Sequence, residues 1–382
     1  MVEADVCIIG GGIMGLSAAH CLSKTPNLKI VLMDQYEIQN EYCSSNDANR
    51  VFRYAYGNDE YYTRMAVESL KLWKDLEEET RSKLLVPTGL LLLKGEDSEA
   101  NKFNEDSHRT LSLLGLGAEK IQGQELQRRY PSFTAREAFF DPNAGVLLAA
   151  KSLSVLAGKV KQAGVRVLEK CKAIRLHADT AHKVETSLGK TVRCRSVIVT
   201  AGPWSNQFRR QGLPSMTPTR QQIVYFKPES GAEIFRPPGF TVFFADQYYG
   251  LPAVGIEGVK VSHKNLWDPV DPDGANRSVS SEFIESARTL CRRFIPELAD
   301  ASVVHSKVCL YDMTKNADFV IGRDPEDPGV VHAYGFSGHG FKFALLIGRT
   351  LAELALEKPT SFNIERFSPT NPHETPVSGP PY

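Results

Sequence analysis

Residues 4–35 contain the feature that most constrains the fold. "ADVCIIG" is an apolar β-type run, "GGGIMGLSAAHCLSK" is a glycine-rich turn leading into a helical pattern, and "LKIVLMDQ" is a second apolar strand. Gly10, Gly12 and Gly15 form a Gly-x-Gly-x-x-Gly motif before the helix, and Asp34 ends the second strand. Such glycines permit a tight turn, the helix N-terminus faces a pyrophosphate, and the acidic residue accepts ribose hydroxyls. The pattern predicts a dinucleotide-binding unit; the alternative is a glycine-rich turn in an unrelated α/β protein.

Later segments predict that this domain is interrupted by another one. "SVIVTAGPW" is a buried strand expected in the nucleotide-binding sheet, with its carboxyl end near the cofactor. "GVVHAYGFSGHGFKFALLIGRTLAELAL" returns as strand, glycine-rich loop and helix, whereas residues 216–308 contain β-type runs and one helix. "LLVPTGLLLLKG" is expected to form a strand pair around a Pro-Thr-Gly turn. We expect a discontinuous nucleotide-binding domain of residues 1–85, 145–215 and 320–382, and a substrate domain of residues 86–144 and 216–319.

Charge and cysteine content favour a small-molecule ligand. Lys and Arg number 45 and Asp and Glu number 45, so neither a nucleic acid nor an anionic membrane is an expected partner. Seven scattered cysteines without a Cys-x-x-Cys motif argue against a disulfide framework or a metal site. The uncharged segment "VCIIGGGIMGLSAAHCLS" contains four glycines and follows Glu3 and Asp5, so it reads as neither a membrane span nor a signal peptide. We expect a cytoplasmic or peroxisomal monomer, although "SGPPY" is not a recognisable peroxisomal tripeptide.

Lys342 is a candidate anion-binding residue. It lies in "GFSGHGFKF", a glycine-rich loop through which a backbone can approach a ligand, at the expected start of a helix. A cation at a helix N-terminus is unfavourable unless an anion compensates it. The alternative is a solvated surface lysine.

Arg50 and Arg53 are a second candidate pair for anion binding. They lie three residues apart in "SSNDANRVFRYAYG" and share a face if the segment is helical. The apolar residues between them indicate partial burial, and buried arginines need anions such as a substrate carboxylate. An internal salt bridge to the acidic helix that follows, "DEYYTRMAVESLKLWKDLEEETR", is the alternative.

Lys260 lies between two valines in a predicted strand and is either buried or exposed on an alternating strand. His263, three residues further on, points to the opposite face of such a strand.

Several motifs in this order resemble one family. The chain is similar, from about residue 4 to 370, to the monomeric sarcosine oxidase and L-pipecolate oxidase family of FAD-dependent amine oxidases. The resemblance rests on the N-terminal glycine motif with Asp34, the Arg-x-x-Arg of "NRVFRYAYG", "VPTGLLLL", "VIVTAGPW", "YYGLP" before Lys260, Cys309 with Tyr311, and "GFSGHGFKF". It implies an α/β fold: a glutathione-reductase-type FAD-binding Rossmann domain with an inserted mixed-sheet substrate domain.

The resemblance also implies roles for particular residues. FAD is joined to Cys309 by an 8α-S-cysteinyl linkage, Arg50 lies against the flavin, and Lys260 activates oxygen. Arg53 and Lys342 hold the substrate carboxylate. Tyr249 and Tyr311 line the substrate cavity, and Asn46, Asn49 and His263 are further substrate-side candidates. The expected cofactor contacts are Gly10, Gly12, Ile13, Met14, Gly15, Asp34, Ser44, Ser45, Arg50, Val167, Cys309, Gly338, Gly340, Phe341 and Lys342.

The expected reaction is oxidation of a secondary amino acid to an imine, with oxygen reduced to hydrogen peroxide. Sarcosine, L-pipecolate, L-proline and N-methyl amino acids are the first substrates. "SSNDANR" departs from the family, because Asn46 replaces a common histidine, and is closer to a fungal branch. The alternative substrate is therefore a bulkier amine such as saccharopine, a fructosyl amino acid or a pathway intermediate, for which a pocket widened near Asn46 and Asn49 would be needed. A non-catalytic flavoprotein and an NAD-dependent dehydrogenase are the remaining alternatives.

Overall fold

A six-stranded sheet forms the centre of the nucleotide-binding half. The computed structural model describes residues 1–177, 181–263 and 267–371. All neighbouring strands of this sheet are parallel except the last pair. The strand order is β10 (Arg166–Leu168), β3 (Ile30–Met33), β2 (Val6–Ile9), β14 (Ser196–Val199), β21 (Val330–Tyr334) and β20 (Val320–Arg323). The predicted place of "SVIVTAGPW" beside the first strand is therefore confirmed, because β14 pairs with β2.

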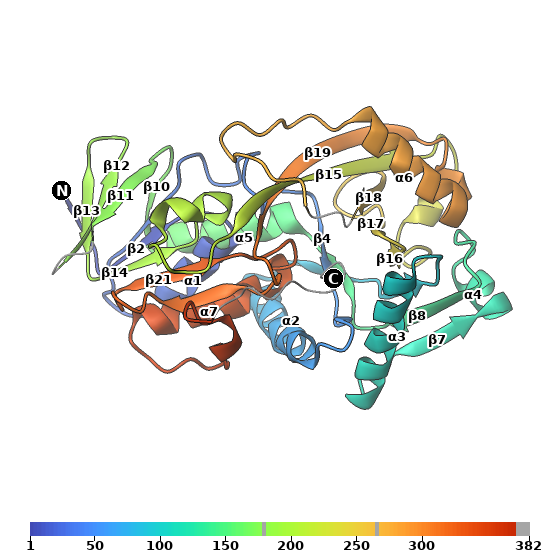
Figure 1. Cartoon of the computed structure of the whole chain (residues 1–382), viewed down its shortest axis with the longest axis horizontal. Coiled ribbons are helices and arrows are strands. Elements are labelled where there is room, and N and C mark those ends of the chain that lie inside the picture. Colours follow the sequence, from blue (N-terminus) through green and yellow to red (C-terminus); the bar gives the residue numbers. More distant parts are fainter. Residues whose placement is uncertain (178–180, 264–266, 372–382) are drawn as a thin grey trace.

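Helices cover one face of this sheet and a smaller sheet covers the other (Figure 1). The helical layer consists of α1 (Ile13–Leu22), α5 (Ala149–Gln162) and α7 (Ala344–Ala355), with α2 (Glu60–Thr80) packed against α7. The opposite layer is β1 (Val2–Glu3), β13 (Thr191–Cys194), β12 (His182–Thr186) and β11 (Ala173–His177). Strands β2 and β3 consist of apolar residues alone, and β14 is apolar after Ser196, because both faces of the sheet are buried there.

The second half is built on an eight-stranded mixed sheet, reached through the two long strands β15 and β19 (Figure 1). Its order is β19 (Ser302–Met313), β15 (Thr217–Lys227), β18 (Val259–His263), β17 (Tyr248–Leu251), β16 (Val242–Ala245), β6 (Leu90–Leu93), β8 (Glu137–Asp141) and β7 (Glu119–Gln122). Only β16 and β6 pair in parallel. One face packs against α4 (Gly123–Arg129) and α6 (Ser281–Phe294), and the other contacts α3 (Ser98–Leu113) and the nucleotide-binding half.

A three-stranded sheet of β4 (Arg50–Phe52), β9 (Gly145–Leu147) and β5 (Leu85–Pro87) corrects two expectations. Arg50 lies in a strand, so the helical arrangement of Arg50 and Arg53 is wrong. The strand pair predicted around Pro-Thr-Gly is also wrong, because β5 joins this sheet and β6 joins the eight-stranded one. Gly89, at φ +73°, turns the chain from one sheet to the other.

The division into two domains at the expected boundaries stays a prediction. In the described part of the chain, no helix combines the length and apolar character needed to cross a membrane.

Candidate functional site

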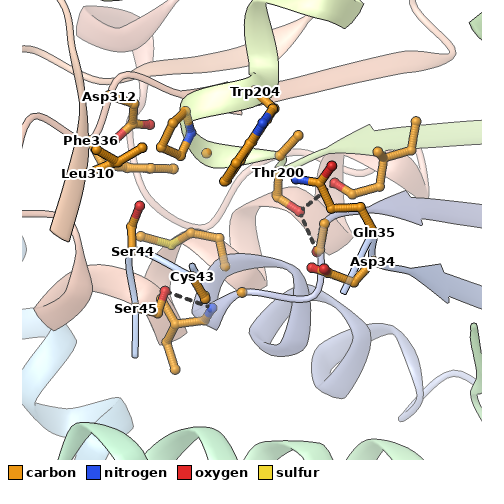
Figure 2. A pocket seen from close by; sticks show the side chains of 18 of the residues that line it. Asp34, Gln35, Cys43, Ser44, Ser45, Thr200, Trp204, Leu310, Asp312 and Phe336 are labelled. Carbon is orange, nitrogen blue, oxygen red and sulfur yellow. Dashed lines mark hydrogen bonds between the residues drawn. The ribbon is translucent and has the colours of Figure 1, made fainter. Parts of the chain in front are cut away.

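A large pocket opens at the carboxyl ends of β2, β3 and β14. It contains about 1120 Å³ of empty space, part of which is open to solvent. Figure 2 shows Asp34 and Gln35 at one end and Leu310, Asp312 and Phe336 at the other. Eleven expected cofactor contacts line it: Gly10, Gly12, Ile13, Met14, Asp34, Ser44, Ser45, Arg50, Gly338, Gly340 and Phe341.

The turn from β2 into α1 brings main chain close to this pocket. Gly10 has φ +106°, and a Cβ atom there would lie 2.3 Å from the Thr200 carbonyl oxygen. A Cβ atom on Gly15 would lie 1.9 Å from the carbonyl oxygen of Gly10, so only glycine lets the helix start here. The Ser45 Oγ accepts from the Ile13 N–H at 3.1 Å, and Gly12, at the start of α1, lies on the pocket wall. A helix N-terminus beside a pocket suits a phosphate.

Asp34 holds the turn from the next strand. Its Oδ2 accepts from the Gly11 N–H at 2.7 Å and its Oδ1 from the Tyr36 N–H at 2.8 Å. Burial raises the pKa of this carboxyl above its ordinary value. Together with the glycine turn and the N-terminus of α1, this carboxylate on the pocket wall fits a dinucleotide.

Four expected cofactor contacts are not among the pocket-lining residues: Gly15, Val167, Cys309 and Lys342. Val167 lies in β10 opposite Leu32. Residues 171–173, in the segment after β10, line the pocket instead. Sequence reasoning missed them because no motif marks this segment.

The second glycine-rich loop follows β21 and meets β19. Gly338 has φ +78°, and a Cβ atom there would lie 2.3 Å from the Tyr311 ring. A Cβ atom on Gly340 would lie 2.7 Å from Phe336. The loop can pack this closely only because it lacks side chains at these positions, which places Phe341 and the glycines beside Leu310–Asp312 at the pocket wall.

Arg50 and Cys309 meet at this wall, although they lie 259 positions apart. The Arg50 Nη2 lies 3.7 Å from the Sγ of Cys309, which is 2% exposed. Tyr311 and Tyr249 lie near enough to Arg50 to raise the pKa of its guanidinium. Burial, and then Tyr249, raises the pKa of Tyr311 well above its ordinary value. The structure therefore brings four of the expected site residues together.

Asp47 is a functional candidate that sequence reasoning missed. Its carboxylate accepts from the Lys260 Nζ at 2.5 Å, from the Tyr225 hydroxyl at 2.6 Å and from the Arg50 guanidinium. Burial alone would raise the pKa of Asp47, but the Lys260 and Arg50 charges hold it well below its usual range. Burial would likewise lower the pKa of Arg50, whereas the Asp47 charge raises it. The only sequence signal was an acidic residue between Asn46 and Asn49.

This cluster settles two of the alternatives. Lys260 is 1% exposed, so it is not a surface lysine. Arg50 forms its ion pair with Asp47, three residues before it, and not with the acidic helix α2.

Lys342 and Arg53 both contact the Tyr56 side chain, Lys342 at its hydroxyl and Arg53 over its ring. The Lys342 Nζ donates to the Tyr56 hydroxyl and to the His339 carbonyl oxygen, both at 2.8 Å. The Arg53 guanidinium carbon lies 4.1 Å from the centroid of the Tyr56 ring. Lys342 is 4% exposed and Arg53 is 3% exposed, so the surface-lysine alternative is wrong. Burial, and then the nearby Arg53 charge, lowers the pKa of Lys342 well below its ordinary value.

The structure does not bring Asn46, Asn49 and His263 to this pair of cations. The Asn46 amide donates to the carbonyl oxygens of Gln39 and Asn40, and the Asn49 amide donates to that of Val254. His263 packs against the Tyr248 ring at 4.4 Å, on the sheet face opposite to Lys260. In the structure, these three side chains therefore contact neighbouring segments of the chain and not Lys342 or Arg53.

Comparison with known proteins agrees with this site. The family model described as DAO, FAD dependent oxidoreductase, matches residues 5–354. The chain belongs to this family. The expected fold class, the FAD cofactor and the resemblance to sarcosine oxidases are thereby confirmed, and the chain is an FAD-dependent oxidoreductase.

Two relatives and one solved structure are similar over nearly their whole length. Monomeric sarcosine oxidase from Bacillus sp. (strain B-0618) is 30% identical over 96% of each chain. N-methyl-L-tryptophan oxidase from Yersinia pestis (strain Pestoides F) is 28% identical over 96% of this chain and 99% of its own. The structure of NikD, an amino acid oxidase essential for nikkomycin biosynthesis, has a TM-score of 0.85 at 22% identity, covering 97% of this chain and 98% of its own. That last likeness supports the fold.

Proposed function

We propose that the protein oxidises the C–N bond of a secondary amino acid to an imine while oxygen is reduced to hydrogen peroxide. The substrate class is that of sarcosine, L-pipecolate, L-proline and N-methyl amino acids. The relatives named as sarcosine oxidase and N-methyl-L-tryptophan oxidase support this class. Two electrons and two protons leave the CH–NH unit of the substrate, and oxygen takes up both pairs.

The observation that carries the proposal is the pair of buried cations around Tyr56. Within the described part of the chain, the Lys342 ammonium donates to a hydroxyl and a carbonyl oxygen and forms no ion pair with a carboxylate. A buried ammonium held only by neutral acceptors is costly, and an arriving carboxylate would remove that cost. Arg53 lies on the same ring and adds a second positive charge for that carboxylate.

FAD, when bound, accepts the hydride equivalent from the substrate and passes the electrons to oxygen. The residues of the chain supply the electrostatics around it. Arg50 provides a fixed positive charge on the pocket wall, which favours negative charge developing on a neighbouring group. We assign to Lys260 the stabilisation of the negative charge that develops on oxygen, because its ammonium is buried in the cluster that contains Arg50.

We further propose that Cys309 is the covalent attachment point of FAD. Its neighbours Leu310, Tyr311 and Asp312 line the pocket, and its sulfur contacts the pocket-lining Arg50. The expected monomeric state is in keeping with the relative named monomeric sarcosine oxidase. The cytoplasmic or peroxisomal location stays a prediction.

A substrate panel tests the proposed function. The purified yellow protein is mixed anaerobically with each amine, flavin absorbance is followed, and peroxide is measured after oxygen is admitted. Each amino acid is paired with its analogue lacking the carboxylate, for example L-pipecolate with piperidine. Saccharopine and a fructosyl amino acid represent the bulkier alternative. We expect a carboxylate-bearing secondary amine to bleach the flavin and its analogue to fail at the same concentration. Bleaching by none of the amino acids, or equally by the analogues, would contradict the proposal.

A further inference from the structure

We propose that Asp47 is a positioning residue for the oxygen half-reaction: it fixes Lys260 and Arg50 as one buried charged unit. The inference rests on the proposed function, because it assigns Lys260 to the step in which oxygen is reduced. It concerns a residue whose importance comes from contacts between distant segments and not from any motif.

The Asp47 carboxylate is surrounded by donors from four places in the chain. Lys260 of β18, Tyr225 of β15, Arg50 of β4 and the N–H of Ala48 all donate to it. The side chains of Asp47 and Lys260 are each 1% exposed. A carboxylate that accepts this many hydrogen bonds in a buried place holds its partners with little freedom.

The charges explain why one carboxylate serves two cations. Lys260 and Arg50 together carry two positive charges, and without a counter-ion each would be buried at a large cost. Asp47 neutralises one of them and leaves the cluster with a net single positive charge beside Cys309. That charge can stabilise an anion forming in the pocket.

The hydrogen bonds of Lys260 leave one N–H donor of its ammonium group for oxygen. An ammonium group has three N–H donors. In the described part of the chain, Asp47 accepts one and the Asn49 carbonyl oxygen, at 3.1 Å, accepts another. The third N–H is then directed by the other two, so that Asp47 fixes where the remaining donor points.

Replacing Asp47 by asparagine removes the charge and keeps the shape. The amide oxygen introduced by Asp47→Asn could still accept from Lys260, but a buried amine without an anion favours its neutral form. Other groups facing the cluster influence this equilibrium: Arg50 from β4, Tyr225 from β15, Tyr249 from β17, and His305, Lys307, Cys309 and Tyr311 from β19. None of these is a second carboxylate.

The decisive measurement is reoxidation of chemically reduced enzyme. FAD in the protein is reduced with dithionite, mixed with oxygen, and followed by absorbance between about pH 6 and pH 9. For Asp47→Asn we expect reoxidation to be at least about tenfold slower than in the wild type at the alkaline end, since each pKa unit changes a protonated fraction tenfold. The rate should approach the wild-type value at the acidic end. An unchanged pH profile, or an equal loss at every pH, would overturn the proposal.

Tyr225→Phe is the matched control. It removes one hydrogen bond to the same carboxylate and leaves every charge in place, so its pH profile should follow the wild type. Where Asp47→Asn fails to fold, Asp47→Glu decides the question. It keeps the charge but lengthens the side chain by one methylene, so reoxidation should slow without a change in pH profile, and an unchanged rate would overturn the proposal.

A double-mutant cycle gives a readout independent of activity. Asp47→Asn leaves the Lys260 and Arg50 charges without their counter-ion, and Lys260→Met leaves Asp47 paired with Arg50 alone. In the double variant Arg50 is the one of the three that stays charged, so the Lys260–Arg50 repulsion of the Asp47→Asn variant is relieved. We expect the melting temperature of the double variant to lie above the value given by adding the two single effects. Additive effects would contradict the pairing. Because the flavin is reduced chemically, these tests do not depend on the substrate, and a failed substrate panel would count against the proposed function alone.

Discussion

At the scale of single residues, the contact between Cys309 and Arg50 leads to a prediction about covalent attachment of FAD. Their contact places one thiol at the edge of a positively charged pocket wall. After acid denaturation, we expect the yellow colour to stay with the wild-type protein and to separate from Cys309→Ser. Cys43→Ser is a suitable control because Cys43 also lines the pocket, and it should keep the colour. Free flavin from the wild type, or bound flavin in Cys309→Ser, would disprove the linkage.

Lys342 carries a second prediction at this scale. A charge-assisted contact with a carboxylate contributes about 1.5–3 kcal/mol, so Lys342→Met should raise the substrate dissociation constant by about 10- to 150-fold. The constant is measured from anaerobic flavin reduction at increasing substrate concentration, and the variant should still hold FAD. Lys358→Met changes an exposed lysine shortly after the end of α7 and should have the wild-type constant. An unchanged constant in Lys342→Met would remove the residue from the substrate site.

At the scale of elements, α1 and α7 pack unusually closely. A Cβ atom on Gly348 of α7 would lie 2.4 Å from the Ser17 Cβ and 2.5 Å from the Ser17 carbonyl carbon of α1. Gly348→Ala should therefore lower the free energy of unfolding by about 1–3 kcal/mol, which urea denaturation measures. Gly158→Ala in α5 is the opposite control: nothing lies within 4 Å of the added Cβ atom, so it should stabilise by about 0.5–1 kcal/mol. Equal stability of the two variants would contradict the close packing.

The elements also show what the sequence could predict. The β2–α1–β3 unit and α2 follow from local patterns of apolar residues and glycines, which act over a few residues. The positions of β4, β5 and β6 depend on partners far away in the chain, such as β9 and β16, and local patterns do not specify these. Asp47 was missed for the same reason, because its partner Lys260 lies 213 positions away. Local sequence marked Lys342 and Arg53 as candidate anion binders, and the family resemblance assigned them to the substrate carboxylate. Their shared contact, Tyr56, is seen only in the structure.

At the scale of the whole molecule, two buried carboxyls give opposite dependences of stability on pH. Burial raises the pKa of Asp312 from 3.8 to about 6, so the folded protein binds more protons here than the unfolded chain between these values. This contribution is fully present below about pH 4 and is lost as pH rises through about 6, amounting to about 3 kcal/mol. Asp47 has a lowered pKa, so its contribution is present above about pH 4 and is lost as pH falls below that.

The Asp312 effect can be isolated with one variant. Asp312→Asn keeps an acceptor for the Gly335 N–H but cannot ionise. We expect its free energy of unfolding, relative to the wild type, to rise by up to about 3 kcal/mol between pH 4 and pH 7. Urea denaturation of both proteins at several pH values provides the measurement. A difference that stays constant across this range would show that Asp312 does not titrate in the folded protein in this way.

The two glycine loops have a consequence for how the enzyme is made. The pocket wall combines residues from Ile9 to Phe341, so the two ends of the site leave the ribosome 332 residues apart. At a synthesis rate of roughly 5–20 residues per second, about 15–70 seconds pass between synthesis of the first and of the last pocket-lining residues. Cofactor loading is therefore a late event in the life of each chain. Chains released before the second glycine loop emerge with the nucleotide fingerprint but without a complete FAD pocket.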